Sequence, residues 1–178
     1  MTSRRVAITW VMLCCCIVTS TAQVHRREPL TPEEIDQLRD AAMDPSMRLK
    51  LYTRFARARL VSLEQARNDP KATDRTQQTH DRLQEFADIY DELNENIDNF
   101  IARKEDMRKP LKAVIEADNE FQAKLLALKS AGDAVPKEVE QYRFLLDSAL
   151  DAVATGLQDH KQLLVEQDEA AKHRKKTT

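Results

Sequence analysis

Apolar residues recur at alternating steps of three and four along residues 83–128, with Lys104 and Asp118 as the only polar interruptions of this face. The apolar members are Leu83, Phe86, Tyr90, Leu93, Ile97, Phe100, Met107, Leu111, Val114, Phe121, Leu125 and Leu128. Such steps keep side chains on one face of a helix and form the heptad pattern of helices that pack at a shallow angle. The segment is therefore predicted to be helical and to bury this face.

A second apolar stripe lies near the end of the chain and includes Gly156 and His160. Its other members are Val139, Tyr142, Leu146, Ala149, Val153 and Leu163, and a neighbouring row holds Leu150, Leu157 and Leu164. Two adjacent apolar rows give a helix an apolar face wide enough to contact two other helices. We expect His160 to be a hydrogen-bonded residue at the edge of the core, and Gly156 to permit close approach of a second helix.

Residues typical of helix ends divide the chain. Thr31-Pro32 with Glu34 has the pattern of a capping box, which predicts a short helix over about 32–42. Asparagine, aspartate, proline and glycine residues mark the ends of the remaining helices. These are predicted over about 45–68, from about 75 onward, and over about 136–170, with a break at 130–133.

Pro110 leaves two interpretations of the long heptad segment. Proline removes a backbone hydrogen bond and disfavours helix at the preceding residue, so the chain could break there and form a compact four-helix bundle. We favour a kinked but continuous helix over about 75–130, because no turn residue flanks Pro110 and the apolar phase passes through it unshifted. That helix would be roughly 80 Å long at about 1.5 Å per residue.

These patterns predict an all-α fold, with no strand pattern and no fixed repeat. The expected architecture is an elongated antiparallel helical bundle with long heptad-patterned, coiled-coil-like helices. It has three to four main helices and a short N-terminal helix. We expect a single domain over residues 31–171, between a polar leader at 23–30 and a basic, frayed tail at 172–178.

The first 22 residues have the composition of an export signal. Arg4 and Arg5 precede a mostly apolar run over residues 6–18, and small residues stand before a cleavage point after Ala22. The protein is therefore expected to be periplasmic or extracellular. Two alternatives remain open, namely an uncleaved signal that anchors the chain in the membrane and a lipidated Cys16.

Composition excludes several classes of enzyme and of metal site. All three cysteines lie in the signal, so the mature chain would have no disulfide or thiolate metal site. Gly132 and Gly156 are the only glycines, which excludes the glycine-rich phosphate loops and the nucleophile elbow. No histidine has an acidic residue three positions before it, as di-metal bundles require. We expect no enzyme, no catalytic residue, no cofactor and no metal.

Charge favours a protein partner over nucleic acid. The net charge of the whole chain is −2, so no basic excess points to nucleic acid. No segment after the signal reaches the roughly 20 apolar residues of a transmembrane span. A protein partner is expected, while the oligomeric state is left open.

Basic and acidic residues separate between two neighbouring helices. Residues 46–68 are rich in arginine and lysine, and residues 81–98 are rich in aspartate and glutamate. One interpretation pairs them across an antiparallel hairpin, with Arg57 near Glu85, Arg54 near Asp88 and Lys50 near Glu92. The other interpretation is an exposed arginine face that binds anionic lipid, a cell-wall polymer or an acidic partner. The candidate partner-binding residues of that face are Arg48, Arg54, Arg57 and Arg59.

Leu30-Thr31-Pro32-Glu33-Glu34 resembles the LTxxQ motif of small periplasmic chaperones of the Spy/CpxP type, with Glu34 in place of the glutamine. The resemblance covers five residues and implies an ATP-independent periplasmic chaperone or stress protein. The whole layout also resembles secreted all-helical bacterial proteins, which implies no particular function. Our leading hypothesis is a non-enzymatic exported protein that acts in protein–protein interaction or scaffolding in the cell envelope. The chaperone is the alternative.

Overall fold

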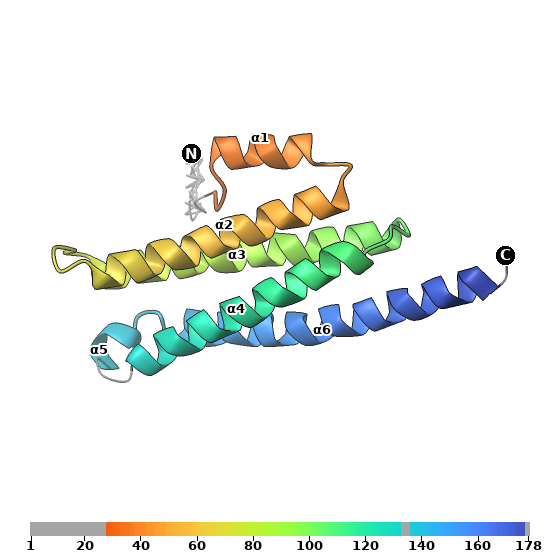
Figure 1. Cartoon of the computed structure of the whole chain (residues 1–178). Helices are drawn as coiled ribbons and strands as arrows, with labels where there is room; N and C mark the ends of the chain where they lie inside the picture. Colours follow the sequence, from red (N-terminus) through yellow and green to blue (C-terminus); the bar gives the residue numbers. More distant parts are fainter. Residues whose placement is uncertain (1–27, 133–135, 177–178) are drawn as a thin grey trace, which may run out of the picture.

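The computed structural model describes residues 28–132 and 136–176, which form six helices and no strand (Figure 1). The helices are α1 (Pro32–Asp40), α2 (Pro45–Asn68), α3 (Arg75–Ala102), α4 (Arg108–Gly132), α5 (Pro136–Val139) and α6 (Arg143–Lys176). The prediction of an all-α fold is confirmed. The expected signal and Cys16 lie outside the described residues.

The capping box that begins α1 is present as predicted. The Thr31 hydroxyl accepts a hydrogen bond from the Glu34 backbone N–H at 3.3 Å, and the Glu34 carboxylate accepts one from the Thr31 N–H at 2.9 Å. In Figure 1, α1 lies along α2, away from α4 and α6. Leu38 of α1 and Leu30 just before it are buried, so the last residue of the expected polar leader belongs to the core.

The second helix has the predicted limits and pairs with the third. The Asp44 carboxylate caps α2 by accepting a hydrogen bond from the Met47 N–H at 3.0 Å. Side-chain hydrogen bonds join Arg48 to Asn96 and Tyr52 to Glu92, so residue numbers rise along α2 as they fall along α3. The α2–α3 contact is the most extensive between two helices of the described chain.

The predicted continuous helix over 75–130 is wrong, because the chain turns between α3 and α4. The turn also does not form at Pro110, which lies in the first turn of α4, where a backbone N–H has no helical partner to lose. Instead the chain turns at Lys104, whose φ is 62°. The Lys104 N–H donates to the Ile101 carbonyl at 2.8 Å and the Glu105 N–H to the Phe100 carbonyl at 3.1 Å, a Schellman motif with lysine where glycine is usual.

The apolar phase passes through this turn because both helices face the same core. All twelve apolar members of the predicted seam are buried. Three of their rings cluster, with the Phe86 centroid 5.9 Å from Tyr90 and 5.3 Å from Phe121. These aromatic contacts join α3 to α4 at the centre of the molecule.

The last helical segment also differs from the prediction. A turn separates α5 from α6, and α6 continues to Lys176 rather than ending near residue 170. The turn lets Val139 and Tyr142 both point into the core. Gly132 makes room for α5, because a Cβ there would lie 2.5 Å from a Val139 methyl group.

The far end of α6 extends past the other helices. The Met107 backbone N–H at the start of α4 donates to the Gln167 side chain at 3.4 Å. Residues 168–176 therefore continue beyond the start of α4, as Figure 1 shows.

Candidate functional site

A fully buried polar group lies at the centre of the bundle. Tyr90 of α3, Asp118 of α4 and His160 of α6 have exposed fractions of 1%, 0% and 3%. The Tyr90 hydroxyl lies 2.9 Å from one carboxylate oxygen of Asp118, and His160 Nδ1 lies 2.8 Å from the other. The Tyr90 hydroxyl donates to Asp118, and His160 donates to the second oxygen in the tautomer that carries its hydrogen on Nδ1. We call these three residues the central triad.

Gly156 makes space for the central triad. A Cβ at this position would lie 2.3 Å from the Tyr90 hydroxyl oxygen, far inside van der Waals contact. The glycine therefore permits close packing as predicted, but the group that approaches it is a side chain of α3. Alanine at position 156 would push the Tyr90 hydroxyl away from Asp118.

The chemistry of the triad is that of a fixed structural network. Burial raises the pKa of Tyr90, and the negative charge and hydrogen bond of Asp118 raise it further. The tyrosine hydroxyl therefore stays protonated and continues to donate. Because all three side chains are buried, their contacts specify how α3, α4 and α6 align.

The arginines predicted to bind a partner have intramolecular contacts. Arg59 is the most buried of them and forms an ion pair with Glu34 of α1 at 2.5 Å, while its Nε lies 3.2 Å from Glu85 of α3. Burial raises the pKa of Glu34, but hydrogen bonds from Arg59 and Thr31, together with the charges of Arg59 and Arg54, lower it overall. Arg59 thus joins three helices.

Arg48 and Arg54 also contact neighbouring helices. The Arg48 guanidinium donates to the Leu38 carbonyl of α1 at 2.5 Å and to the Asn96 side chain of α3 at 2.6 Å. Arg54 donates to the Gln37 side chain of α1, and its guanidinium lies 5.0 Å from the centre of the Phe55 ring. These contacts link α1 to the α2–α3 pair.

The predicted pairing across α2 and α3 is wrong by two residues. Glu85 meets Arg59 instead of Arg57, and the residue opposite Glu92 is Tyr52 instead of Lys50. Asp88 accepts a hydrogen bond from Gln84 of its own helix. A two-residue offset rotates a helix face by about 200°, which explains why different arginines meet α3.

Arg57 points instead toward α4, where it forms an ion pair with Glu120 at 2.8 Å. A second ion pair joins Glu64 to Lys124, also at 2.8 Å, so residue numbers rise together along α2 and α4. Between these helices lie two hollows. We name them the α2–α4 groove and the leucine pocket.

The α2–α4 groove has a volume of about 530 Å³ and lies toward the start of both helices. Its lining residues are Asp44, Ser46, Met47, Lys50, Thr53, Arg57, Lys109, Pro110, Ala113, Glu116, Ala117 and Glu120. Of the four candidate partner-binding arginines, Arg57 is the one that lines it.

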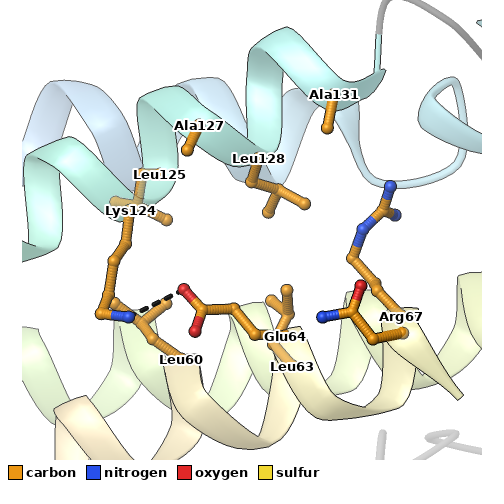
Figure 2. Close-up of a pocket in the computed structure, with 10 residues that line it drawn as sticks. Leu60, Leu63, Glu64, Arg67, Lys124, Leu125, Ala127, Leu128 and Ala131 are labelled. Atoms are coloured by element: carbon orange, nitrogen blue, oxygen red, sulfur yellow. Dashed lines mark hydrogen bonds and ion pairs between the residues drawn. The ribbon is translucent and has the colours of Figure 1, made fainter.

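The leucine pocket has a volume of about 170 Å³ and lies toward the other end of α2 and α4. Figure 2 shows leucines from both helices at its base, the Glu64–Lys124 pair on one side and Arg67 on the other. The Arg67 guanidinium donates to the Tyr142 hydroxyl at 2.9 Å. The pocket thus combines an apolar base with a charged rim.

The described residues contain neither a metal site nor a membrane-spanning helix. Residues 28–132 and 136–176 contain no group of three or more potential metal ligands placed to hold an ion. No helix in this part of the chain is both long and apolar enough to cross a membrane.

Comparison of the chain with protein-family models, curated proteins and solved structures gives no match. The structure itself defines an all-helical protein with a buried polar centre and two hollows between α2 and α4. The resemblance to Spy/CpxP-type chaperones stays a prediction.

Sequence reasoning named the central triad only in part. Asp118 stood out as a polar interruption of one seam, and His160 lay on the facing stripe, but nothing in the spacing paired them. Two polar residues on two apolar faces are a signal of such a pair, since each needs a buried partner. The α2–α4 groove and the leucine pocket have no sequence signal, because both depend on the distance between α2 and α4.

Proposed function

We propose that this chain is an exported, non-enzymatic protein that acts in protein–protein interaction or scaffolding in the cell envelope. In this proposal it is an elongated antiparallel bundle of heptad-patterned helices, and its partner binds in the α2–α4 groove. The observation that carries the proposal is the make-up of this groove, which combines small side chains with charges of both signs.

The base of the groove suits apolar side chains of a partner helix. Ala113, Ala117, Thr53 and Pro110 line it and leave room between α2 and α4. Met47 at its edge is 48% exposed, and a flexible thioether adapts to a bound surface. An amphipathic helix laid in such a groove would bury apolar anchors at helical spacing.

The rim of the groove supplies orientation. Lys50 and Arg57 project from α2, while Lys109, Glu116 and Glu120 project from α4. Charges of both signs favour one direction of a bound helix over the other, because like charges placed together cost free energy. Arg57 would contribute from its position in the Glu120 ion pair.

The test is crosslinking in the native envelope, followed by mass spectrometry, with a groove variant and a matched control. Ala113→Trp fills the groove from an exposed position, and Ala123→Trp places the same ring on an exposed position of α4 outside both hollows. We expect one definite partner that is lost with Ala113→Trp and kept with Ala123→Trp. Equal crosslinking by both variants would reject the groove as the interaction surface.

The same variants separate the chaperone alternative, which the exposed Met47 of the groove and the exposed Met43 favour. A chaperone of the Spy/CpxP type would suppress the aggregation of several unrelated clients without nucleotide. Suppression that Ala113→Trp weakens across all clients would support that function in place of a scaffold.

A further inference from the structure

We infer that the leucine pocket binds a small monocarboxylate with an apolar body about the size of a benzene ring. This inference goes beyond the proposed function, because it concerns a different hollow and a small molecule. It rests on the size, the lining and the charge of the pocket.

The base of the pocket is apolar and formed by well-packed side chains. Figure 2 shows Leu60 and Leu63 of α2 facing Leu125 and Leu128 of α4. All four side chains are at most 7% exposed. A cavity of about 150 Å³ lined by such residues accepts benzene. The observed volume of about 170 Å³ therefore suits a phenyl ring or a chain of about six carbons.

The rim carries more positive than negative charge. Lys124 and Arg67 stand on opposite sides of the opening, and Glu64 is the one acidic residue among the lining side chains. The Glu64–Lys124 pair is partly exposed, so solvent weakens it and a ligand carboxylate can compete for the ammonium group.

Arg67 is held in place for such a contact. Its guanidinium donates to the Tyr142 hydroxyl at 2.9 Å and lies 5.9 Å from the centre of the Tyr142 ring. That hydrogen bond uses one of five N–H donors, and the planar group binds carboxylates through paired donors. A carboxylate at the opening would thus meet two cations, with its apolar body against the leucines.

The probes are hexanoate and phenylacetate, with 1-hexanol and hexylamine as matched compounds that lack the negative charge. Binding is followed by calorimetry and by the NMR signals of the leucine methyl groups. We expect saturable binding of both acids, perturbation of the Leu60, Leu63, Leu125 and Leu128 methyl signals, and at least about tenfold weaker binding of the alcohol and the amine.

Two sets of variants test the location and the charge. Ala127→Leu fills the pocket from an exposed position and should abolish binding, whereas Ala123→Leu should leave it unchanged. Arg67→Gln should weaken acid binding by about tenfold, whereas Lys129→Gln, elsewhere on α4, should not.

Three results would overturn the inference. These are the absence of saturable binding, equal binding of hexanoate and hexylamine, and undiminished binding by Ala127→Leu. None of them bears on the α2–α4 groove, whose test uses a different variant and a protein partner.

Discussion

Replacement of Asp118 by alanine is expected to destabilise the protein strongly. The change removes the common acceptor of Tyr90 and His160, both buried, at 2.9 and 2.8 Å. Each of the two buried groups left unsatisfied costs about 1–3 kcal/mol. We therefore expect the free energy of unfolding to fall by about 2–6 kcal/mol.

Urea denaturation followed by circular dichroism measures this change, because the slope also reports whether unfolding remains two-state. Asn119→Ala is the matched control, since Asn119 is the exposed neighbour of Asp118 on α4 and its side chain donates to the Ile115 carbonyl of its own helix turn. It should change the free energy of unfolding by less than about 0.5 kcal/mol.

A triple variant separates a specific network from simple burial. Tyr90→Phe, Asp118→Leu and His160→Leu together remove every polar member at similar volume, so no donor is left without an acceptor. This variant should lose less than about 2 kcal/mol, because apolar replacement of a whole buried network is close to neutral. Two results would refute the reasoning. One is a loss below about 1 kcal/mol for Asp118→Ala, and the other is a loss above about 2 kcal/mol for the triple variant.

Two further predictions concern a backbone turn and a buried hydroxyl. Lys104→Gly should raise the free energy of unfolding by about 0.5–1 kcal/mol, because φ at this residue is 62° and glycine adopts that conformation without steric cost. The control is Lys112→Gly, at an exposed position within α4, which should lower the free energy of unfolding by about 1 kcal/mol in the same urea titration. Because the pKa of Tyr90 is raised in the folded protein, the unfolded chain releases the tyrosine proton first. The contribution of Tyr90 to stability is therefore full below pH about 10, the ordinary tyrosine pKa, and falls above that pH by up to about 1.4 kcal/mol per pH unit. Stability measured against pH should therefore decline less steeply for Tyr90→Phe than for the unaltered protein, and equal slopes would contradict the assignment.

The helices could be predicted from the sequence where capping residues and apolar spacing agree. The limits of α2 and the capping box of α1 are of this kind, since Asp44 and Thr31 act on neighbouring backbone groups. The buried seam over residues 83–128 follows from the same local rule. The all-α fold needs little more than this pattern.

The turn between α3 and α4 could not be placed in this way. Pro110 is the residue with a known backbone effect, whereas the chain turns at Lys104, a residue type that rarely adopts a positive φ. Lys104 was visible as a polar interruption of the seam. Its role depends on the packing of α3 against α2 and of α4 against α6, which outweighs the local preference.

The contacts of the candidate site needed the third dimension. Charge segregation predicted that α2 and α3 pair, but their alignment depends on buried packing and differs by two residues. Arg57 consequently faces α4 and lines the α2–α4 groove. The leucine pocket depends on the separation of two helices that are far apart in sequence, so no local pattern reveals it.

The central triad also limits slippage between helices. A shift of α6 by one residue would move His160 about 1.5 Å along the axis and about 100° around it, which would break its bond to Asp118. The apolar stripe itself resists a shift of one residue, but it tolerates a shift of one heptad, because one apolar residue then replaces another. That shift would move His160 about 10.5 Å along the axis and would also break its bond to Asp118. With one polar residue from each of α3, α4 and α6, the heptad repeat loses this degeneracy and a single alignment of the three helices is selected.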